Sequence, residues 1–115
     1  MTPEGRNEAV EFAARVAALD SLLDHRVRLA ICVLLSRSDR LSFSRLQQLT
    51  AETDGSLGAH LRKLEDAGHV KVKKEFVGRK PTSWYALSPA GLEALAAHLD
   101  ALTDLLSAAR SPSGE

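Results

Sequence analysis

The segment TDGSLGAHLRKLEDAGHVKV, residues 53–72, decides the fold that this chain is expected to adopt. Leu57, Leu61 and Leu64 recur at the spacing of one helix face, which predicts a short helix over about residues 54–67. A small and basic outer face on that helix suits the major groove of DNA, and it also suits the surface of an ordinary α+β domain. The outer face consists of Ser56, Ala59, Arg62 and Lys63.

Both ends of this helix carry local signals. Thr53 or Asp54 is expected to cap its start, because either side-chain oxygen accepts a hydrogen bond from a free amide of the first turn. Gly68 is expected just beyond the last turn, where a glycine commonly ends a helix. Val70 and Val72 then alternate with lysines, which predicts the beginning of a strand.

A second short helix is predicted before this one. Ser42 is expected to cap a helix over about residues 43–50, which would bury Phe43, Leu46 and Leu49. Two short helices joined by a tight turn, the second with a polar and basic outer face, form a helix-turn-helix.

Two alternating segments after the helices predict a β-hairpin. They cover residues 69–76 and 82–87, and the connection VGRKP (77–81) combines turn-forming glycine and proline with two basic residues. Residues 41–43 are expected to add a short third strand. Three helices followed by a basic hairpin indicate a winged helix rather than a plain three-helix bundle.

The most apolar helix is expected over residues 22–36, at the centre of the core. Arg26, Arg28 and Arg37 are expected to stand away from its apolar side, and His25 is interpreted as a cap or a surface residue. The single cysteine, Cys32, lies in the same helix and is expected to be a small buried hydrophobe.

Helices are also predicted at both ends of the domain. The first covers residues 8–19 with an alanine-rich face, and the last covers residues 89–110, with Ser88 as its cap and Pro89 in its first turn. Leucines of the last helix follow a heptad spacing, which is typical of a helix that packs along another helix. Packing of this seam on the domain's own core is the alternative. The predicted dimer interface is Phe12, Val16, Leu92, Leu95, Leu99, Leu102 and Leu106.

Composition limits the classes of function. A chain of 115 residues is expected to form one domain, here residues 8–110 between flexible tails at 1–7 and 111–115. The net charge is zero, yet residues 21–80 contain 12 Lys and Arg against 7 Asp and Glu. A basic centre between acidic ends is compatible with a phosphate-bearing partner. No apolar run suits a signal peptide or a membrane span, which predicts a cytoplasmic protein without a membrane partner.

Four motifs occur together in this chain: HRVRLAICVLL (25–35), TDGSLGAHLRKLEDAGHV (53–70), FVGRKP (76–81) and WYALSPAGLEAL (84–95). In combination they resemble the winged-helix transcriptional regulators of the MarR/ArsR type, in particular the compact one-domain subgroup. The resemblance covers about residues 20–106. It implies a DNA-binding regulator that is usually a homodimer, with the dimer formed by the terminal helices.

The chain departs from the family pattern at several positions. Ser56 and Gly58 stand in the recognition helix where the family has Asn and Ser, and His69 stands where it has Tyr. Arg26 or Val27 occupies a position at which proline is common. Because the first change falls on residues that would face DNA, the target sequence of the family does not carry over to this chain.

These observations predict a mainly α (α+β) winged helix-turn-helix with N- and C-terminal dimerisation helices. Its expected function is sequence-specific transcriptional regulation as a homodimer on double-stranded DNA. The helix over about 54–67 would lie in the major groove, and the wing, residues 76–82, on the backbone or minor groove. A winged-helix module that binds proteins and not DNA is the alternative. The predicted DNA contacts are Ser44, Arg45, Gln47, Thr53, Gly55, Ser56, Ala59, His60, Arg62, Lys63, Lys73, Arg79 and Lys80.

No catalytic, cofactor or metal site is predicted. His25, His60, His69 and His98 lack the spacing of metal ligands, and no phosphate-binding glycine loop occurs. The sequence leaves open the operator, the sign of regulation and the existence of a small-molecule effector. The only place expected to suit an effector is a cleft between the core and the terminal helices. Trp84 is the residue of interest there, with a position in the core as the alternative.

Overall fold

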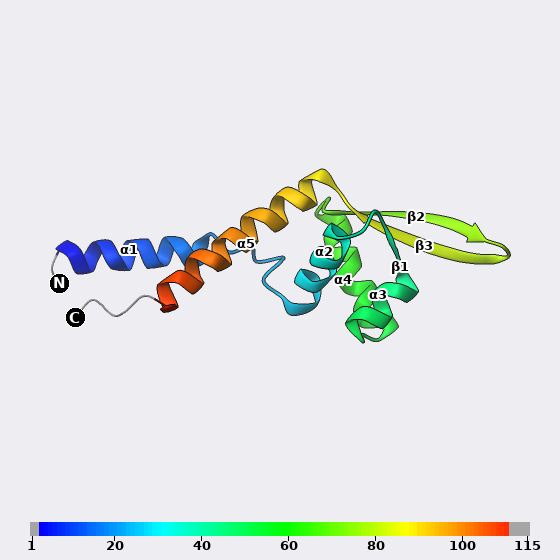
Figure 1. Ribbon diagram of the computed structural model, residues 1–115, viewed down its shortest axis with the longest axis horizontal. Coiled ribbons are helices and arrows are strands. Elements are labelled where there is room, and N and C mark those ends of the chain that lie inside the picture. Colours follow the sequence, from blue (N-terminus) through cyan, green and yellow to red (C-terminus); the bar gives the residue numbers. More distant parts are fainter. Residues whose placement is uncertain (1–2, 111–115) are drawn as a thin grey trace.

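The computed structural model describes residues 3–110, with side chains from Gly5 onward. Within this part of the chain, five helices and three strands follow one another (Figure 1). They are helix α1 (Pro3–Ala17), helix α2 (Arg26–Ser36), strand β1 (Leu41–Ser42), helix α3 (Phe43–Thr50), helix α4 (Asp54–Asp66), strand β2 (Val70–Val77), strand β3 (Lys80–Leu87) and helix α5 (Pro89–Arg110). Helices α2, α3 and α4 together with the small sheet form a winged helix, so the predicted fold is confirmed.

The predicted N-terminal tail overlaps helix α1, which begins at Pro3 and not near residue 8. Proline suits the first turn of a helix, because its missing amide hydrogen needs no partner there and its φ is already helical. The alanine-rich spacing therefore showed where the helix gains an apolar side, and not where it begins. Residues 1–2 and the predicted tail 111–115 lie outside the described residues.

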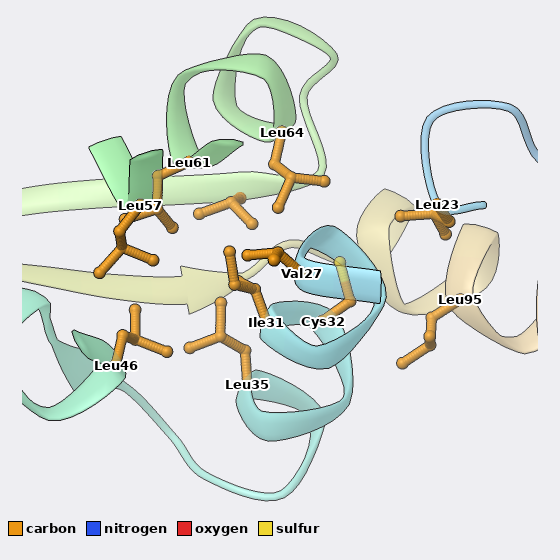
Figure 2. Close-up of a cluster of buried hydrophobic side chains, with 11 residues drawn as sticks. Leu23, Val27, Ile31, Cys32, Leu35, Leu46, Leu57, Leu61, Leu64 and Leu95 are labelled. Carbon is orange, nitrogen blue, oxygen red and sulfur yellow. The ribbon is translucent and has the colours of Figure 1, made fainter. Parts of the chain in front are cut away.

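One aliphatic core joins helix α4 to helix α2 (Figure 2). Leu57, Leu61 and Leu64 are buried in it, as their spacing predicts. Burial of one such side chain stabilises the fold by roughly 1.5–3 kcal/mol, so these three leucines hold helix α4 firmly. The other buried members are Leu23, Val27, Ile31, Cys32, Leu35, Leu46, Val70 and Leu95.

Local caps set the bounds of the two helices of the helix-turn-helix. The Thr53 hydroxyl accepts from the Ser56 amide at 3.2 Å, and the Ser42 hydroxyl accepts from the Arg45 amide at 3.1 Å. Gly68 follows helix α4 with a φ of +79°, a left-handed conformation that favours glycine. All three features agree with the sequence-based prediction.

Helix α2 begins at Arg26 and not at residue 22. The Asp20 carboxylate accepts from the amides of Leu22 at 2.9 Å and Leu23 at 3.3 Å, which holds this segment in a turn. His25 Nδ1 accepts a hydrogen bond from the Val27 amide at 3.2 Å, so His25 caps the helix. A cap was one of the two roles that the sequence suggested for His25. Leu23 is fully buried although it lies outside the helix.

The strands form one antiparallel sheet in the order β1-β3-β2. Leu41 pairs with strand β3, which confirms the predicted third strand. Val77 pairs with Lys80, so the hairpin turns over two residues, a tighter turn than the predicted connection over 77–81. Gly78 permits this turn because its φ is +65°.

Leu49 contradicts the predicted burial pattern of helix α3, since it is 43% exposed. Helix α3 contacts the core through the fully buried Leu46, and its last turn lies at the edge of the fold. Leu49 therefore lines a shallow hollow at the surface together with Leu34 and Arg45.

Helices α1 and α5 pack on each other and extend away from the winged helix (Figure 1). The molecule is consequently elongated, with extents of 68 × 24 × 23 Å. The leucines of the predicted interface do not share one environment. Leu95 is only 3% exposed because it belongs to the core of its own chain, so it is removed from the predicted interface. Leu99 is 40% exposed.

Candidate nucleic-acid interface

Helix α4 presents its outer face to solvent. Its three buried leucines orient the helix, and on the opposite side Ala59, Arg62 and Lys63 are exposed. Gly55 and Gly58 have open space where a Cβ atom would be, with no atom within 4 Å. The face thus combines close access to the backbone near the helix N-terminus with two cationic side chains farther along.

The turn between helices α3 and α4 is braced by Gln47. Its side-chain amide donates to the Glu52 carbonyl oxygen at 3.3 Å and to the Asp54 carboxylate. Ala51 takes a left-handed conformation in this turn, with a φ of 56°. Gln47 was predicted to contact DNA, and in this structure its amide stabilises the geometry of the helix-turn-helix.

His60 is engaged with helix α2. The Arg28 guanidinium donates to His60 Nδ1 at 3.0 Å, and the His25 ring lies 4.4 Å from the His60 ring between centroids. Burial, followed by the charges of His25 and Arg28, lowers the pKa of His60 from its ordinary 6.5. His60 therefore occupies the edge of the candidate interface as a neutral, hydrogen-bonded ring.

Arg28 corrects the sequence-based prediction, because it is 9% exposed and does not stand away from the apolar side of helix α2. Arg28, Cys32 and Leu35 follow one another at helical spacing, and all three are buried. That spacing places Arg28 next to buried positions of the helix, but the acceptors that allow its burial come from Leu22 and His60 and were not visible in the sequence of helix α2. Arg28 is the residue near the site that sequence reasoning missed.

The wing projects beyond the body of the fold, and Arg79 and Lys80 are exposed at its tip (Figure 1). Phe76, near the tip, is 76% exposed. Its side chain is on the same face of strand β2 as that of the buried Val70, because the two residues are six positions apart. The hairpin simply extends farther than the helices that cover its base. An exposed aromatic ring between basic residues is a further candidate contact that alternation alone did not distinguish from a core residue.

The predicted cations differ in their freedom to bind a partner. Lys73 Nζ lies 3.4 Å from the Glu75 carboxylate. The same carboxylate accepts a hydrogen bond from the Arg40 guanidinium at 3.2 Å. Arg45 donates to the Gln48 side chain at 3.2 Å. The other four cations among the predicted contacts make no side-chain hydrogen bond or ion pair within residues 3–110: Arg62, Lys63, Arg79 and Lys80.

The predicted contact residues fall into two groups by exposure. Gln47, Ser56 and His60 are half-buried. Exposed are Ser44, Arg45, Thr53, Gly55, Ala59, Arg62, Lys63, Lys73, Arg79 and Lys80.

Trp84 lies away from the cleft in which an effector was expected. It sits on the sheet face that carries Lys71 and Lys73, and the Arg40 guanidinium lies 4.1 Å from its ring centroid. With Ala86 these residues line an open hollow of about 460 Å³. The sequence did not show which of Trp84 and Tyr85 faces the core, because the two neighbours point to opposite faces of the strand and both are aromatic.

Among the described residues, no three His, Cys, Asp or Glu side chains gather in a group that could hold a metal ion. Cys32 is fully buried, and burial raises the pKa of its thiol to about 11, so it is a poor nucleophile. No described helix is long and apolar enough to cross a membrane.

Comparison with known families identifies the same architecture. The sequence model of the winged helix DNA-binding domain matches residues 27–106, from helix α2 into helix α5. No curated protein matches the chain.

Solved structures share the fold. A transcriptional regulator homologue from Pyrococcus horikoshii is 28% identical, with a TM-score of 0.72 over 78% of this chain and 89% of that chain. The regulator BldR from Sulfolobus solfataricus is 21% identical, with a TM-score of 0.67 over 95% of this chain and 77% of that chain. Sco3205 is a MarR family transcriptional regulator from Streptomyces coelicolor that was solved in complex with DNA. It is 22% identical, with a TM-score of 0.61 over 97% of this chain and 82% of that chain.

Proposed function

Because this chain belongs to the winged helix DNA-binding domain family, we propose that it is a transcriptional regulator that binds specific DNA sequences as a homodimer. Helix α4 would enter the major groove, and the wing would contact the backbone or the minor groove. The DNA-bound state of Sco3205, which shares the fold, is consistent with this proposal.

The observation that carries the proposal is the exposed face of helix α4. A helix held by three buried leucines offers two unpaired cations, Arg62 and Lys63, on its solvent side. Gly55, Gly58 and Ala59 beside them have no side-chain donors for base edges. Base discrimination should therefore concentrate on Arg62 and Lys63, with DNA shape supplying the rest.

The dimer is supported by apolar side chains that the single chain leaves exposed. Val10, Phe12 and Val16 of helix α1 are exposed, as are Leu92, Leu99 and Leu106 of helix α5. A two-fold dimer through these helices would present two copies of helix α4 to one side of a duplex. We therefore expect two half-sites about one helical turn apart, roughly 10 base pairs.

The test begins with selection of bound DNA from a random pool by the purified protein. Affinities for all single-base variants of the selected site are then measured for the parent, Arg62→Ala and Arg62→Lys. We expect Arg62→Ala to lose about 1–3 kcal/mol of discrimination at one or two positions per half-site. Arg62→Lys keeps the charge and loses bidentate geometry, so it should relax the same positions while retaining more of the overall affinity.

Two outcomes would contradict this assignment. A uniform loss of affinity with unchanged base preferences in Arg62→Ala would make Arg62 a phosphate contact. Failure to enrich any DNA, together with absence of heparin binding, would favour the alternative of a winged-helix module that binds proteins.

A further inference from the structure

We propose that Arg28 and His60 form a pH-sensitive latch that positions helix α4 against helix α2, and that acid opens it and lowers site-specific DNA binding. The effect on DNA binding rests on the proposed function of helix α4. The latch itself is a property of the folded chain and is testable without DNA.

Arg28 connects three segments through one guanidinium. Its Nε–H donates to the Leu22 carbonyl oxygen at 2.6 Å, in the turn before helix α2. Its second donor reaches His60 Nδ1 on helix α4 at 3.0 Å. Arg28 is 9% exposed and His60 is half-buried, so water reaches this connection only from the His60 side. The hydrogen bond adds a polar constraint on helix α4, at its His60 edge, to the packing of the buried leucines.

The contact assigns the proton of the His60 ring. A guanidinium has only donors, so His60 Nδ1 must be the acceptor, and the ring is neutral with its proton on Nε2. A second proton would occupy Nδ1, remove the acceptor and place two cations against each other. Protonation of His60 and closure of the latch thus exclude each other.

His25 reinforces this dependence. Its ring lies 4.4 Å from the His60 ring, and its own Nδ1 accepts from the Val27 amide at 3.2 Å. His25 therefore joins the cap of helix α2 to the ring of His60 on helix α4.

The titratable groups around His60 are mostly basic. His25 and Arg28 come from the start of helix α2, Lys63 from helix α4, and Glu52 from the turn before helix α4. Burial is the largest cause that lowers the pKa of His60, the three basic groups lower it further, and only Glu52 opposes them. The latch is consequently intact above the ordinary pKa of 6.5, and it opens as pH falls through the lowered pKa of folded His60.

The consequence for DNA follows from the position of the latch on the helix. Arg62 and Lys63 follow His60 by two and three residues, within the same turn. The buried leucines keep helix α4 on the body when the latch opens, so the protein stays folded. The Arg28 contact adds a constraint on the outer face at its His60 edge, so an open latch would loosen the placement of Arg62 and Lys63. Base readout needs that placement more than phosphate attraction does.

The first experiment follows the latch by NMR in the free protein. His60→Asn is the decisive variant, because the Asn side-chain oxygen replaces Nδ1 as an acceptor for Arg28 and does not titrate. From about pH 7.5 to about pH 5.5, the parent should show coupled shifts of the His60 ring and the helix α4 amides. The amide shifts should be lost in His60→Asn. Equal amide shifts in both proteins would overturn the latch.

The second experiment measures the ratio of affinities for the selected site and for random DNA at the same two pH values. In the parent this ratio should fall at least about fivefold in acid, the lower range of coupling between linked sites, and in His60→Asn it should stay constant. His25→Asn keeps a capping oxygen and the latch, so it should retain the fall with a midpoint shifted to higher pH.

The outcomes separate the latch from the proposed function. If acid strengthens binding of the parent to all DNA and His60→Asn loses that gain, His60 is a phosphate contact and the proposal is wrong. If no DNA is bound at either pH while the NMR transition is present, the latch is supported and the proposed function is overturned.

Discussion

For a single residue, the tightest packing at a glycine among the described residues is found at Gly91. A Cβ atom there would overlap the His69 carbonyl oxygen and lie 2.9 Å from the Leu87 Cδ1 atom. The Ser88 hydroxyl accepts from the Gly91 amide at 2.9 Å and donates to the Gly68 carbonyl oxygen at 2.6 Å. One small side chain and two glycines thus fix the start of helix α5 against the start of strand β2.

We expect Gly91→Ala to destabilise the fold by about 1–3 kcal/mol, because backbone atoms must move to admit the methyl group. Gly58→Ala is the matched control. It lies inside helix α4 with no atom within 4 Å of its Cβ position, so it should stabilise the fold by up to about 1 kcal/mol. Urea denaturation of both variants checks the pair, and a neutral Gly91→Ala would contradict the packing described.

At the element scale, the wing shows how far a hairpin extends once its turn is tight. The two-residue connection at Gly78 and Arg79 keeps strands β2 and β3 paired to their ends, out to the pair of Val77 and Lys80. The helices cover only the base of this ribbon, which leaves Phe76 exposed near the tip. The element therefore carries its free cations away from the body of the fold.

Under the proposed function, replacing both Arg79 and Lys80 with Ala should weaken binding to all DNA sequences similarly. It should also flatten the dependence of log K on log salt by about 0.9 for each phosphate that the variant no longer neutralises. Lys73→Ala is the control on the same hairpin, since Lys73 lies beside Glu75 and should change the slope less. An unchanged slope in the double variant would place the phosphate contacts elsewhere.

At the scale of the whole molecule, the two terminal helices are too long for one domain to cover. Helix α5 has 22 residues, and its N-terminal part packs in the core through Leu95. Farther along, helix α5 has helix α1 beside it, and most of helix α1 is itself exposed. A second copy of the chain is the partner that would cover both helices with one two-fold interface.

We expect Leu99→Glu to give a monomer at concentrations where the parent sediments as a dimer, because a buried unpaired charge costs several kcal/mol. Leu49→Glu is the matched control. Leu49 is a similarly exposed leucine on helix α3, away from the terminal helices, so its substitution should leave the dimer intact. A parent that is monomeric at tens of micromolar would refute the dimer.

Features that depend on neighbours within one or two helical turns were predictable from the amino-acid sequence. Thr53, Ser42 and Gly68 bound their helices as expected, because a cap is made by a side chain and amides only two or three residues away. The leucine spacing of helix α4 identified its buried face for the same reason. Together with the hairpin pattern, these local signals were enough for the winged-helix fold.

The docking of whole elements settles which parts of an amphipathic pattern are covered. Leu95 and Leu99 share one heptad seam, yet Leu95 is in the core and Leu99 is 40% exposed. The part of helix α5 that is covered beyond Leu95 is the side of His98 and Ala101, which are both buried. Arg28 is buried because Leu22 and His60, far apart in sequence, supply acceptors on both sides of its guanidinium. Such contacts depend on how whole elements dock, and spacing along one helix does not encode the surface that meets it.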